Sequence, residues 1–499
     1  MSKLSSLKDK IIDFINDRNE YCHLVVFVAG LYPFFQYYSN NISEATSWQQ
    51  LLFIAGLCFV LPQILLLLWN YCKNFKIFTR IRTNGISILN AVVFSGLIGF
   101  LVLNLNRKML LATFIVAAVI GFILVKHLKK IIIIQVILAV TSIVSLVPKL
   151  LFELQHDNAT WATISDEELN TTLLKTPNIF VIQPDGYVNF SDMDQPPYSF
   201  NNSDFEAWLG TSGFTNYRNF RSNYYSTYTS NSSMFAMQHH YYTNTNRATL
   251  KTHDANEAIV GKYNNVLNIL KKNNYKSHLI TDNSYFLIDR EVSHYDYCNI
   301  KANQLSFYKS GVLKDMDMLS DFKSVLDTLS DSKNFFFIEK TVPGHIRHRE
   351  NISEGKTIER LKYLDEVKLA NQWIKSLVVQ ISEFDEQALI IIVADHGGYV
   401  GLDYTLEAVN RKLNHLETIS AFSSMLSIKW PKDYIPDGLT FKSNVNLFRN
   451  VFYTLSKNDK LLSNSKDNSS FLPLMENGKA NYYQYIDDKG NFVFNKVSK

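Results

Sequence analysis

The chain of 499 residues is longer than one ordinary domain, and its composition changes after the first third. A formal net charge of only +4 at pH 7 gives no indication of a nucleic-acid partner. Three of the four cysteines lie in or beside apolar N-terminal segments, which leaves Cys298 alone in the rest of the chain. A disulfide framework is therefore excluded there, and that part needs an ordinary hydrophobic core.

The first third of the chain is typical of membrane helices. Most of its five apolar segments approach the ~20 residues that a helix needs to cross a bilayer. These segments are residues 24–38, 51–71, 86–105, 109–125 and 131–150. We therefore predict a cell-membrane domain over residues 1–150 with about five transmembrane helices.

Lys and Arg are concentrated in three stretches that flank these segments, which predicts the orientation in the membrane. The stretches are residues 3–18, 73–82 and 126–130. The loop of residues 39–50 has neither Lys nor Arg, whereas Arg107 and Lys108 run against the distribution. Most of the Lys and Arg residues therefore predict a cytoplasmic N-terminus. With an odd number of membrane crossings, the rest of the chain then lies on the extracytoplasmic side.

The remaining chain divides into a polar linker over residues 151–177 and a domain over residues 178–499. Short apolar runs typical of buried strands alternate in this domain with longer amphipathic runs typical of helices. The predicted strands are residues 178–183, 277–281, 334–340, 388–394 and 424–429, and the predicted helices are residues 264–273, 315–329, 357–384 and 445–455. This alternation predicts an α/β sandwich with a largely parallel central sheet, capped by a polar tail after residue 457.

Polar side chains follow three of these strands. Asp185 comes after the first, His345 after the third, and Asp395 with His396 directly after the fourth. Ligands of open α/β sheets gather at the carboxyl ends of the strands, so these side chains face a candidate site. Pro-Asp-Gly and Asp-His-Gly are also ordinary turn sequences, and a histidine alone is more often a surface or core residue than a ligand. His348 lies three residues after His345 as a further candidate.

A stretch rich in hydroxyl and amide side chains, residues 214–242, surrounds a Met-Phe-Ala-Met run of helical character. Hydroxyls ahead of a helix commonly cap it. A helix N-terminus also points its amides and its positive dipole end at an anionic substrate, which suits a nucleophile. Both roles stay open for the Ser and Thr residues of this stretch.

Two carboxylates, an imidazole and a hydroxyl would together make a mainly oxygen-based site for a divalent metal such as Zn, Mn or Mg. Such an ion lowers the pKa of a coordinated hydroxyl and neutralises charge on a phosphoryl oxygen. The combination predicts phosphoryl transfer.

This pattern resembles the alkaline phosphatase superfamily over roughly residues 178–455, and in particular its sulfatase-like branch, which contains the membrane-anchored lipoteichoic acid synthases and phosphoethanolamine transferases. The resemblance implies that Asp185, Asp395 and His396 bind the metal. Asp185 stands in an Asp-Gly-aromatic form that is similar to the phosphodiesterases and sulfatases, whereas the two transferase groups usually have Glu. The subgroup therefore stays open.

The family nucleophile lies seven residues before a Leu-Leu or Met-Phe pair, which implies Thr227 as nucleophile and metal ligand, with Ser226 and Thr229 as alternatives. Sulfatases proper carry Cys or Ser in a Cys/Ser-x-Pro-x-Arg motif, whereas residues 227–231 contain no Cys, Pro or Arg. Sulfate-ester hydrolysis through a formylglycine is therefore not expected. A threonine nucleophile resembles the transferases and the nucleotide pyrophosphatases, which form a phospho-threonine.

The resemblance also implies that His345 binds phosphoryl oxygens or protonates the leaving group. His348 and His415 are further substrate-binding candidates. The phosphodiesterases have an Asp for a second metal where this chain has Thr341, which implies one divalent metal as the cofactor.

The predicted protein is a membrane-anchored, metal-dependent transferase that moves a phosphoglycerol or phosphoethanolamine headgroup from a membrane phospholipid, through phospho-Thr227, to an envelope glycan. A phosphodiesterase or sulfatase-like hydrolase that uses the same residues is the alternative. An inactive membrane scaffold is an alternative of another class, but a scaffold has no need for all four metal-site residues. A transporter or sensor is disfavoured because the membrane segments contain almost no acid or base. Donor, acceptor, metal, oligomeric state and the choice between transfer and hydrolysis stay open.

Overall fold

A computed structural model of the chain describes residues 2–497 with several gaps. The residues left out within this range are 18, 20, 43–46, 156–159, 241–249, 251, 288–292, 306–315, 330–332, 435 and 437. The end of the hydroxyl-rich stretch 214–242 and the start of the predicted helix 315–329 lie outside the described residues. The chain forms two compact units, Met1–Asp157 and Asn158–Lys499.

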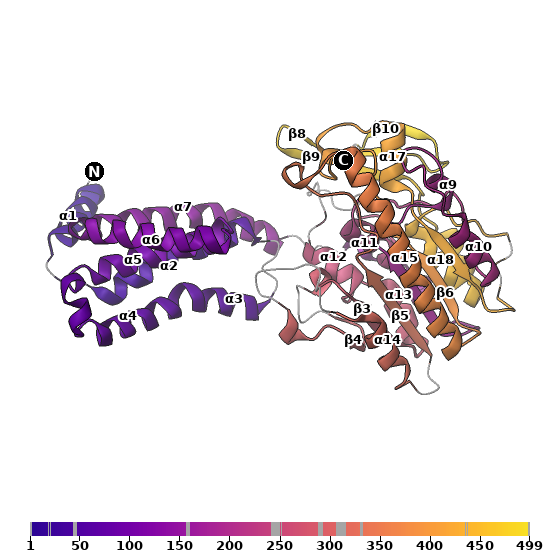
Figure 1. Ribbon diagram of the computed structural model, residues 1–499, viewed down its shortest axis with the longest axis horizontal. Coiled ribbons are helices and arrows are strands. Elements are labelled where there is room, and N and C mark those ends of the chain that lie inside the picture. Colours follow the sequence, from indigo (N-terminus) through magenta and orange to yellow (C-terminus); the bar gives the residue numbers. More distant parts are fainter. Residues whose placement is uncertain are drawn as a thin grey trace. The chain divides into compact units, whose positions relative to one another are not determined.

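The N-terminal unit is built from helices that run alongside one another (Figure 1). They are α1 (Ser2–Asn16), α2 (Cys22–Asn40), α3 (Trp48–Ala55), α4 (Leu61–Cys72), α5 (Gly85–Leu97), α6 (Arg107–Ile123) and α7 (Leu128–Gln155), with π-helical turns at Gly56–Val60 and Ile98–Val102. Apolar side chains from α2, α3 and α5 and from both π-helical turns form its largest core cluster.

Among the described residues, three helical segments are long and apolar enough to cross a membrane: Trp48–Cys72, Gly85–Val102 and Val125–Leu151. They correspond to three of the five predicted crossings, residues 51–71, 86–105 and 131–150. The other two predicted crossings, residues 24–38 and 109–125, form α2 and α6. Crossing by these two helices stays a prediction.

The helices of this unit pack closely and pair their buried amides. A Cβ atom at Gly30 would lie 1.9 Å from the carbonyl oxygen of Cys58, so only glycine permits this approach of α2 to the π-helical turn. Asn90 and Gln135, each 1% exposed, exchange side-chain hydrogen bonds at 2.9 and 3.2 Å between α5 and α7. Paired amides satisfy each other where lipid and packed side chains exclude water.

A seven-stranded sheet forms the centre of the C-terminal unit, in the order β2-β7-β6-β1-β5-β3-β4. The strands are β1 (Ile179–Pro184), β2 (Thr215–Asn216), β3 (Lys276–Thr281), β4 (Tyr297–Cys298), β5 (Asn334–Lys340), β6 (Leu389–Val393) and β7 (Leu426–Lys429). Five adjacent strands, β4, β3, β5, β1 and β6, run parallel, and β7 pairs antiparallel with β6. The predicted largely parallel sheet is confirmed.

Helices cover both faces of this sheet, as the α/β sandwich requires (Figure 1). They are α8 (Asp166–Leu169), α9 (Phe190–Met193), α10 (Ser203–Thr211), α11 (Thr227–Ala236), α12 (Thr252–Ile259), α13 (Asn265–Lys272), α14 (Met318–Leu326), α15 (Lys356–Phe384), α16 (Glu407–Asn410), α17 (His415–Phe422), α18 (Asn444–Ser456) and α19 (Asp459–Ser463). Successive side chains of a strand point to opposite faces, so alternate residues of each central strand enter two separate cores.

The two cores divide the helices between them. Phe336 and Ile338 of β5 pack with α9, α10, α14, α15 and α17. Phe335 and Phe337 of the same strand pack with α11, α12, α13 and α18 on the other face. The face to which a strand residue points therefore decides which helices it meets.

The tail after residue 457 is more than the expected polar cap. It forms an antiparallel sheet of β8 (Ser470–Glu476), β9 (Lys479–Ile486) and β10 (Phe492–Lys496). Aromatic side chains such as Tyr483 and Tyr485 join the core on the α15 face. The two tyrosines are two residues apart on β9, which is the period of a strand buried on one face.

Candidate metal centre

Asp185 and Asp395 lie side by side because they end neighbouring parallel strands at the same level. β1 and β6 pair in register from Ile179 with Leu389 to Ile182 with Ile392. Each carboxylate comes three residues after the last of these pairs. The backbone N–H of Gly186 donates to Oδ1 of Asp395 at 3.0 Å and ties the two strand ends together.

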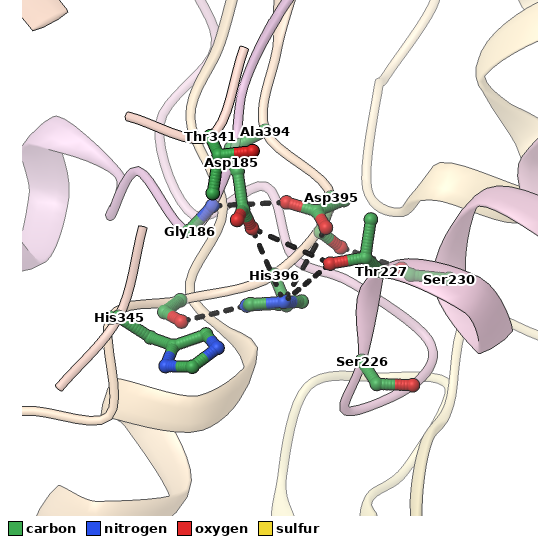
Figure 2. Close-up of polar contacts among 12 residues, drawn as sticks. Asp185, Gly186, Ser226, Thr227, Ser230, Thr341, His345, Ala394, Asp395 and His396 are labelled. Atoms are coloured by element: carbon green, nitrogen blue, oxygen red, sulfur yellow. Dashed lines mark hydrogen bonds and ion pairs between the residues drawn. The ribbon is translucent and has the colours of Figure 1, made fainter. Parts of the chain in front are cut away.

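Three side chains converge at this point with their ligand atoms within 4.8 Å of one another: Asp185, Asp395 and His396. Nε2 of His396 lies 3.5 Å from Oδ1 of Asp185 and 3.4 Å from Oδ2 of Asp395 (Figure 2). All three residues are at most 4% exposed. The structure thus brings together the three predicted metal ligands.

The chemistry of this cluster fits a divalent cation. Oδ2 of Asp395 is buried without a hydrogen-bond partner. Nδ1 of His396 donates to the carbonyl oxygen of Gly397 at 2.8 Å, which leaves a lone pair on Nε2 of the neutral ring for a metal. Burial, and then the neighbouring Asp395, raise the pKa of Asp185 to about 8. A cation bound between the carboxylates would remove this repulsion.

Burial disfavours the charged form of His396, but the two neighbouring carboxylates outweigh this effect and raise the pKa of this histidine.

The backbone carbonyl oxygen of Asp395 is held by hydrogen bonds from two helices. It accepts hydrogen bonds from the Ser230 hydroxyl at 2.5 Å and from the Asn444 amide at 3.0 Å. These bonds connect the end of β6 to α11 and α18 and orient the carboxylate.

The hydroxyl of Thr227 faces this cluster from the first turn of α11 (Figure 2). Its Oγ1 atom lies 3.2 Å from Nε2 of His396 and 3.5 Å from Oδ1 of Asp185. The side chains of Ser226 and Thr229 instead form the capping box of the helix, in which each accepts a hydrogen bond from the backbone N–H of the other. Of the three hydroxyls considered, the geometry thus favours Thr227 as the one that faces the metal ligands.

His345 lies beside the cluster, after the turn that follows β5. Its ring centroid is 6.0 Å from that of His396, and the residue is exposed at the surface. Nδ1 donates to the carbonyl oxygen of Ile346 at 2.6 Å, so the neutral ring has its free lone pair on Nε2. The protein packed around the ring, and then the neighbouring His396, lower the pKa of His345.

The other two predicted histidines lie further away. His348 has its ring 6.2 Å from that of His345, and its Nδ1 atom lies 2.8 Å from the Thr405 hydroxyl. His415 begins α17 and packs against Phe492 of β10, with ring centroids 3.8 Å apart. The substrate-binding role of both histidines stays a prediction.

Three polar residues near the cluster are absent from the sequence-based prediction: Glu339, Asp282 and Tyr285. The two acids are buried, and Asp282 accepts hydrogen bonds from the backbone and hydroxyl of Thr341. The acid directly after the apolar run 335–338 of β5 was the signal for Glu339. No comparable signal marked Tyr285 in a chain with 27 tyrosines.

Residues 198–419 match the model of the sulfatase family. No curated protein matches the chain. Among solved structures, the integral membrane lipooligosaccharide phosphoethanolamine transferase A of Neisseria meningitidis is 13% identical, with 74% of this chain and 75% of that chain covered and a TM-score of 0.40. The C-terminal periplasmic domain of EcEptC from Escherichia coli, in complex with Zn, is 12% identical, with 63% and 93% covered and a TM-score of 0.41.

The C-terminal periplasmic domain of the phosphoethanolamine transferase EptC from Campylobacter jejuni is 15% identical, with 57% of this chain and 94% of that chain covered and a TM-score of 0.37. Likeness at this level assigns no substrate. The family match covers the segment that runs through α11, β3, β5 and β6 and includes Thr227, His345, Asp395 and His396. The chain therefore contains a sulfatase-family enzyme domain over residues 198–419.

Proposed function

We propose that this protein is a membrane-anchored phosphotransferase that moves the headgroup of a phospholipid through a covalent phospho-Thr227 to a hydroxyl of an envelope glycan. The observation that carries the proposal is the position of the Thr227 hydroxyl, within 3.5 Å of two metal-binding side chains at the start of α11. A nucleophile in this position meets the substrate phosphorus next to the cation and next to the positive end of the helix dipole.

Asp185, Asp395 and His396 would hold one divalent cation, Mn, Zn or Mg, with Thr227 as a fourth ligand. Bound there, the cation neutralises charge on the phosphoryl oxygens and lowers the pKa of the Thr227 hydroxyl. In the first half-reaction, Oγ1 of Thr227 loses its proton and forms a bond to phosphorus. The bond from phosphorus to the diacylglycerol oxygen breaks, and that oxygen takes up a proton.

In the second half-reaction, a glycan hydroxyl loses its proton and attacks phospho-Thr227, and the Thr227 oxygen is protonated again. His345 is suited to accept the proton of the incoming hydroxyl. With its pKa lowered from 6.5, its ring is neutral at pH 7, and Nδ1 already donates to the carbonyl oxygen of Ile346. The free Nε2 atom is therefore an acceptor, which fits this step better than protonation of the first leaving group.

The three membrane-capable helical segments support a lipid-borne donor. A phospholipid stays in the bilayer, so a catalytic domain attached to membrane helices meets its headgroup at the surface. We propose an extracytoplasmic catalytic domain and a cytoplasmic N-terminus, following the distribution of Lys and Arg.

Intact-mass analysis of the full-length protein tests this proposal. The protein would be incubated with Mn or Zn and with vesicles of either phosphatidylethanolamine or phosphatidylglycerol. We expect a metal-dependent mass increase in the wild type, equal to one phosphorylated headgroup, together with release of diacylglycerol. Thr227→Ala should show neither, whereas Thr215→Ala, which removes an exposed hydroxyl on β2, should behave like the wild type.

The two vesicle types identify the donor, and an added glycan separates transfer from hydrolysis. Loss of the adduct to water at the same rate with and without glycan supports the hydrolase. Metal-loaded wild type that forms no adduct with either lipid and releases no diacylglycerol contradicts the proposal and supports a scaffold. Equal activity in Thr227→Ala excludes Thr227 as the nucleophile.

A further inference from the structure

Tyr399 follows the proposed metal ligands Asp395 and His396 and has an unusual backbone conformation. Its φ is +60°, in the left-handed region that residues other than glycine rarely adopt. The surroundings hold this conformation. The backbone N–H of Tyr399 donates to the carbonyl oxygen of Ser420 at 3.2 Å, and its carbonyl oxygen accepts from the N–H of Leu402 at 3.2 Å. Strained residues held in this way are concentrated at functional sites, so the side chain needs an explanation.

The ring of Tyr399 packs against both histidines of the site. Its centroid lies 6.3 Å from that of His345 and 5.8 Å from that of His396, and the ring planes are inclined by 80° and 71°. The two imidazoles are themselves 6.0 Å apart. Edge-to-face contacts between rings are favourable. The tyrosine ring therefore limits the positions that the two imidazoles can take.

The hydroxyl of Tyr399 reaches the segment in front of the proposed nucleophile. It donates to the backbone carbonyl oxygen of Tyr225, although 174 residues separate the two in the chain. Tyr225 directly precedes Ser226, the N-cap of α11, and Thr227 is the first residue of that helix. The hydrogen bond therefore fixes the chain two residues before Thr227.

Packing alone does not explain a tyrosine at this position. Tyr399 is only 2% exposed, and a glycine or an asparagine would adopt its backbone conformation with less strain. A phenylalanine would fill the same space but would leave the carbonyl oxygen of Tyr225 without this donor. The tyrosine combines a ring that contacts the histidines with a hydroxyl that contacts the start of α11, and separate substitutions can remove the two.

We propose that Tyr399 is a positioning residue that aligns the Thr227 hydroxyl with the metal ligands and with His345. Its hydroxyl fixes the start of α11, which sets where the nucleophile lies, and its ring fixes the two imidazoles. The inference rests on the proposed function, because it assumes that Thr227 attacks phosphorus next to the cation. Loss of the hydroxyl should slow this attack, and loss of the ring should also affect metal binding and resolution of the adduct.

The test uses the full-length, Mn-loaded protein with bis(4-nitrophenyl) phosphate as the probe. Oγ1 of Thr227 loses its proton and bonds to phosphorus, the bond from phosphorus to one 4-nitrophenolate oxygen breaks, and single-turnover absorbance records the release. Tyr399→Phe keeps the ring and removes the hydroxyl. We expect the rate of release at saturating probe to fall about 10- to 100-fold, because a displaced nucleophile costs this much. The Mn affinity and the probe concentration at half-maximal rate should stay within about twofold, since the metal ligands and the rings remain.

Tyr399→Leu removes the ring as well as the hydroxyl. Besides the slower attack, we expect the Mn affinity to fall about 10-fold, because an imidazole ligand that loses its support binds metal less well. The adduct on Thr227 should also persist about 10-fold longer than in Tyr399→Phe, because His345 accepts the proton of the incoming hydroxyl in that step. Isothermal titration calorimetry and intact-mass analysis measure the two changes.

Tyr275→Phe is the matched control for loss of a buried tyrosine hydroxyl. Tyr275 is 3% exposed, and its hydroxyl donates to the carbonyl oxygen of Pro177 at 2.8 Å. It directly precedes β3, so it lies at the end of the parallel sheet opposite to the site. Tyr275→Phe should lower the Tm by an amount similar to Tyr399→Phe and leave the rate of release unchanged.

A rate of release in Tyr399→Phe within about threefold of the wild type overturns the proposal, as does an equal loss of rate in Tyr275→Phe. A wild-type Mn affinity in Tyr399→Leu also overturns it, and if Tyr399→Leu does not fold, Tyr399→Phe decides alone. The proposed function fails separately: in that case metal-loaded wild type releases no 4-nitrophenol, or Thr227→Ala releases as much as the wild type. The Mn affinity of Tyr399→Leu then still tests the contact between the tyrosine ring and His396.

Discussion

Oγ1 of Thr227 lies 3.2 Å from Nε2 of His396, although 169 residues separate them in the chain. The first residue begins α11 and the second comes after β6, and Ser230 joins the two elements through the carbonyl oxygen of Asp395. The proposed nucleophile and the proposed metal ligands are thus joined by hydrogen bonds between the two elements. Disturbing either element should affect both metal binding and phosphoryl transfer.

Metal binding should stabilise the protein measurably. A cation that binds only the folded state adds about 2.7 kcal/mol at a free concentration one hundred times its Kd. We expect Mn or Zn to raise the Tm of the wild type and EDTA to reverse the rise, as measured by differential scanning fluorimetry. Asp395→Ala should abolish the shift, whereas Asp403→Ala, an exposed acid, should keep it. A full shift in Asp395→Ala would show that the cation binds elsewhere.

Gly186 should not tolerate a side chain. Its φ is +67°, and an added Cβ atom would lie 2.1 Å from the carbonyl oxygen of Gly344. Both the strain and the clash should shift the strand end, so Gly186→Ala should lower stability by about 1–3 kcal/mol and weaken metal binding. Thermal unfolding and Mn titration measure the two effects.

Gly210 is the matched control for that substitution. It lies in α10 with ordinary helical backbone, and nothing approaches an added Cβ atom within 4 Å. Gly210→Ala should raise stability by up to about 1 kcal/mol, because alanine favours the helix. If both variants changed stability equally, the close approach at Gly186 would not be the cause.

Arg449 and Glu168 form a buried ion pair that joins α18 to α8. They are 0% and 2% exposed at the side chain, with Nη2 of the arginine 3.0 Å from Oε1 of the acid, and the arginine also donates to the carbonyl oxygen of Met237. Arg449→Met leaves a buried carboxylate without its partner and should cost about 3–5 kcal/mol. The Arg449→Met/Glu168→Leu double variant should recover much of this loss, as measured by thermal unfolding. A double variant less stable than Arg449→Met would contradict this account.

His239 should make stability fall on acidification. Its Nε2 atom donates to the carbonyl oxygen of Asp467 at 2.7 Å, and Nδ1 lies 3.0 Å from the Tyr224 hydroxyl, so the folded state holds the neutral ring. Burial lowers its pKa from 6.5 to about 4. On acidification the unfolded state therefore binds a proton at His239 before the folded state does. The neutral ring of the folded state contributes its full stability above pH 6.5, and this contribution disappears as the pH falls toward 4.

The loss from His239 should be on the order of 3 kcal/mol. To measure it, the Tm of His239→Gln is subtracted from that of the wild type at pH 7.5 and at pH 4.5. Other titrating groups are the same in both proteins and cancel in this difference. The difference should shrink at the lower pH. His415→Gln, at an exposed histidine, should follow the wild type at both values. A difference that stays constant would show that His239 does not titrate in this way.

The sequence by itself determined the strands and the polar residues placed directly after them. Uninterrupted apolar runs such as 389–393 can be buried on both faces only in a sheet covered by helices, so they predict the sandwich. A polar residue directly after such a run must lie at the carboxyl edge, which was sufficient to predict Asp185, Asp395 and His396 as neighbours. Local pattern and the geometry of parallel strands are enough for this step.

Only the tertiary structure decided which side chains enter the site from elsewhere. Ser226, Thr227 and Thr229 are similar in sequence, and helix capping, which occupies two of them, selects the third. The hydrogen bond from Tyr285 to Glu339 depends on β3 and β5 lying side by side. Contacts between elements distant in the chain follow from packing, and no local pattern of residues encodes them.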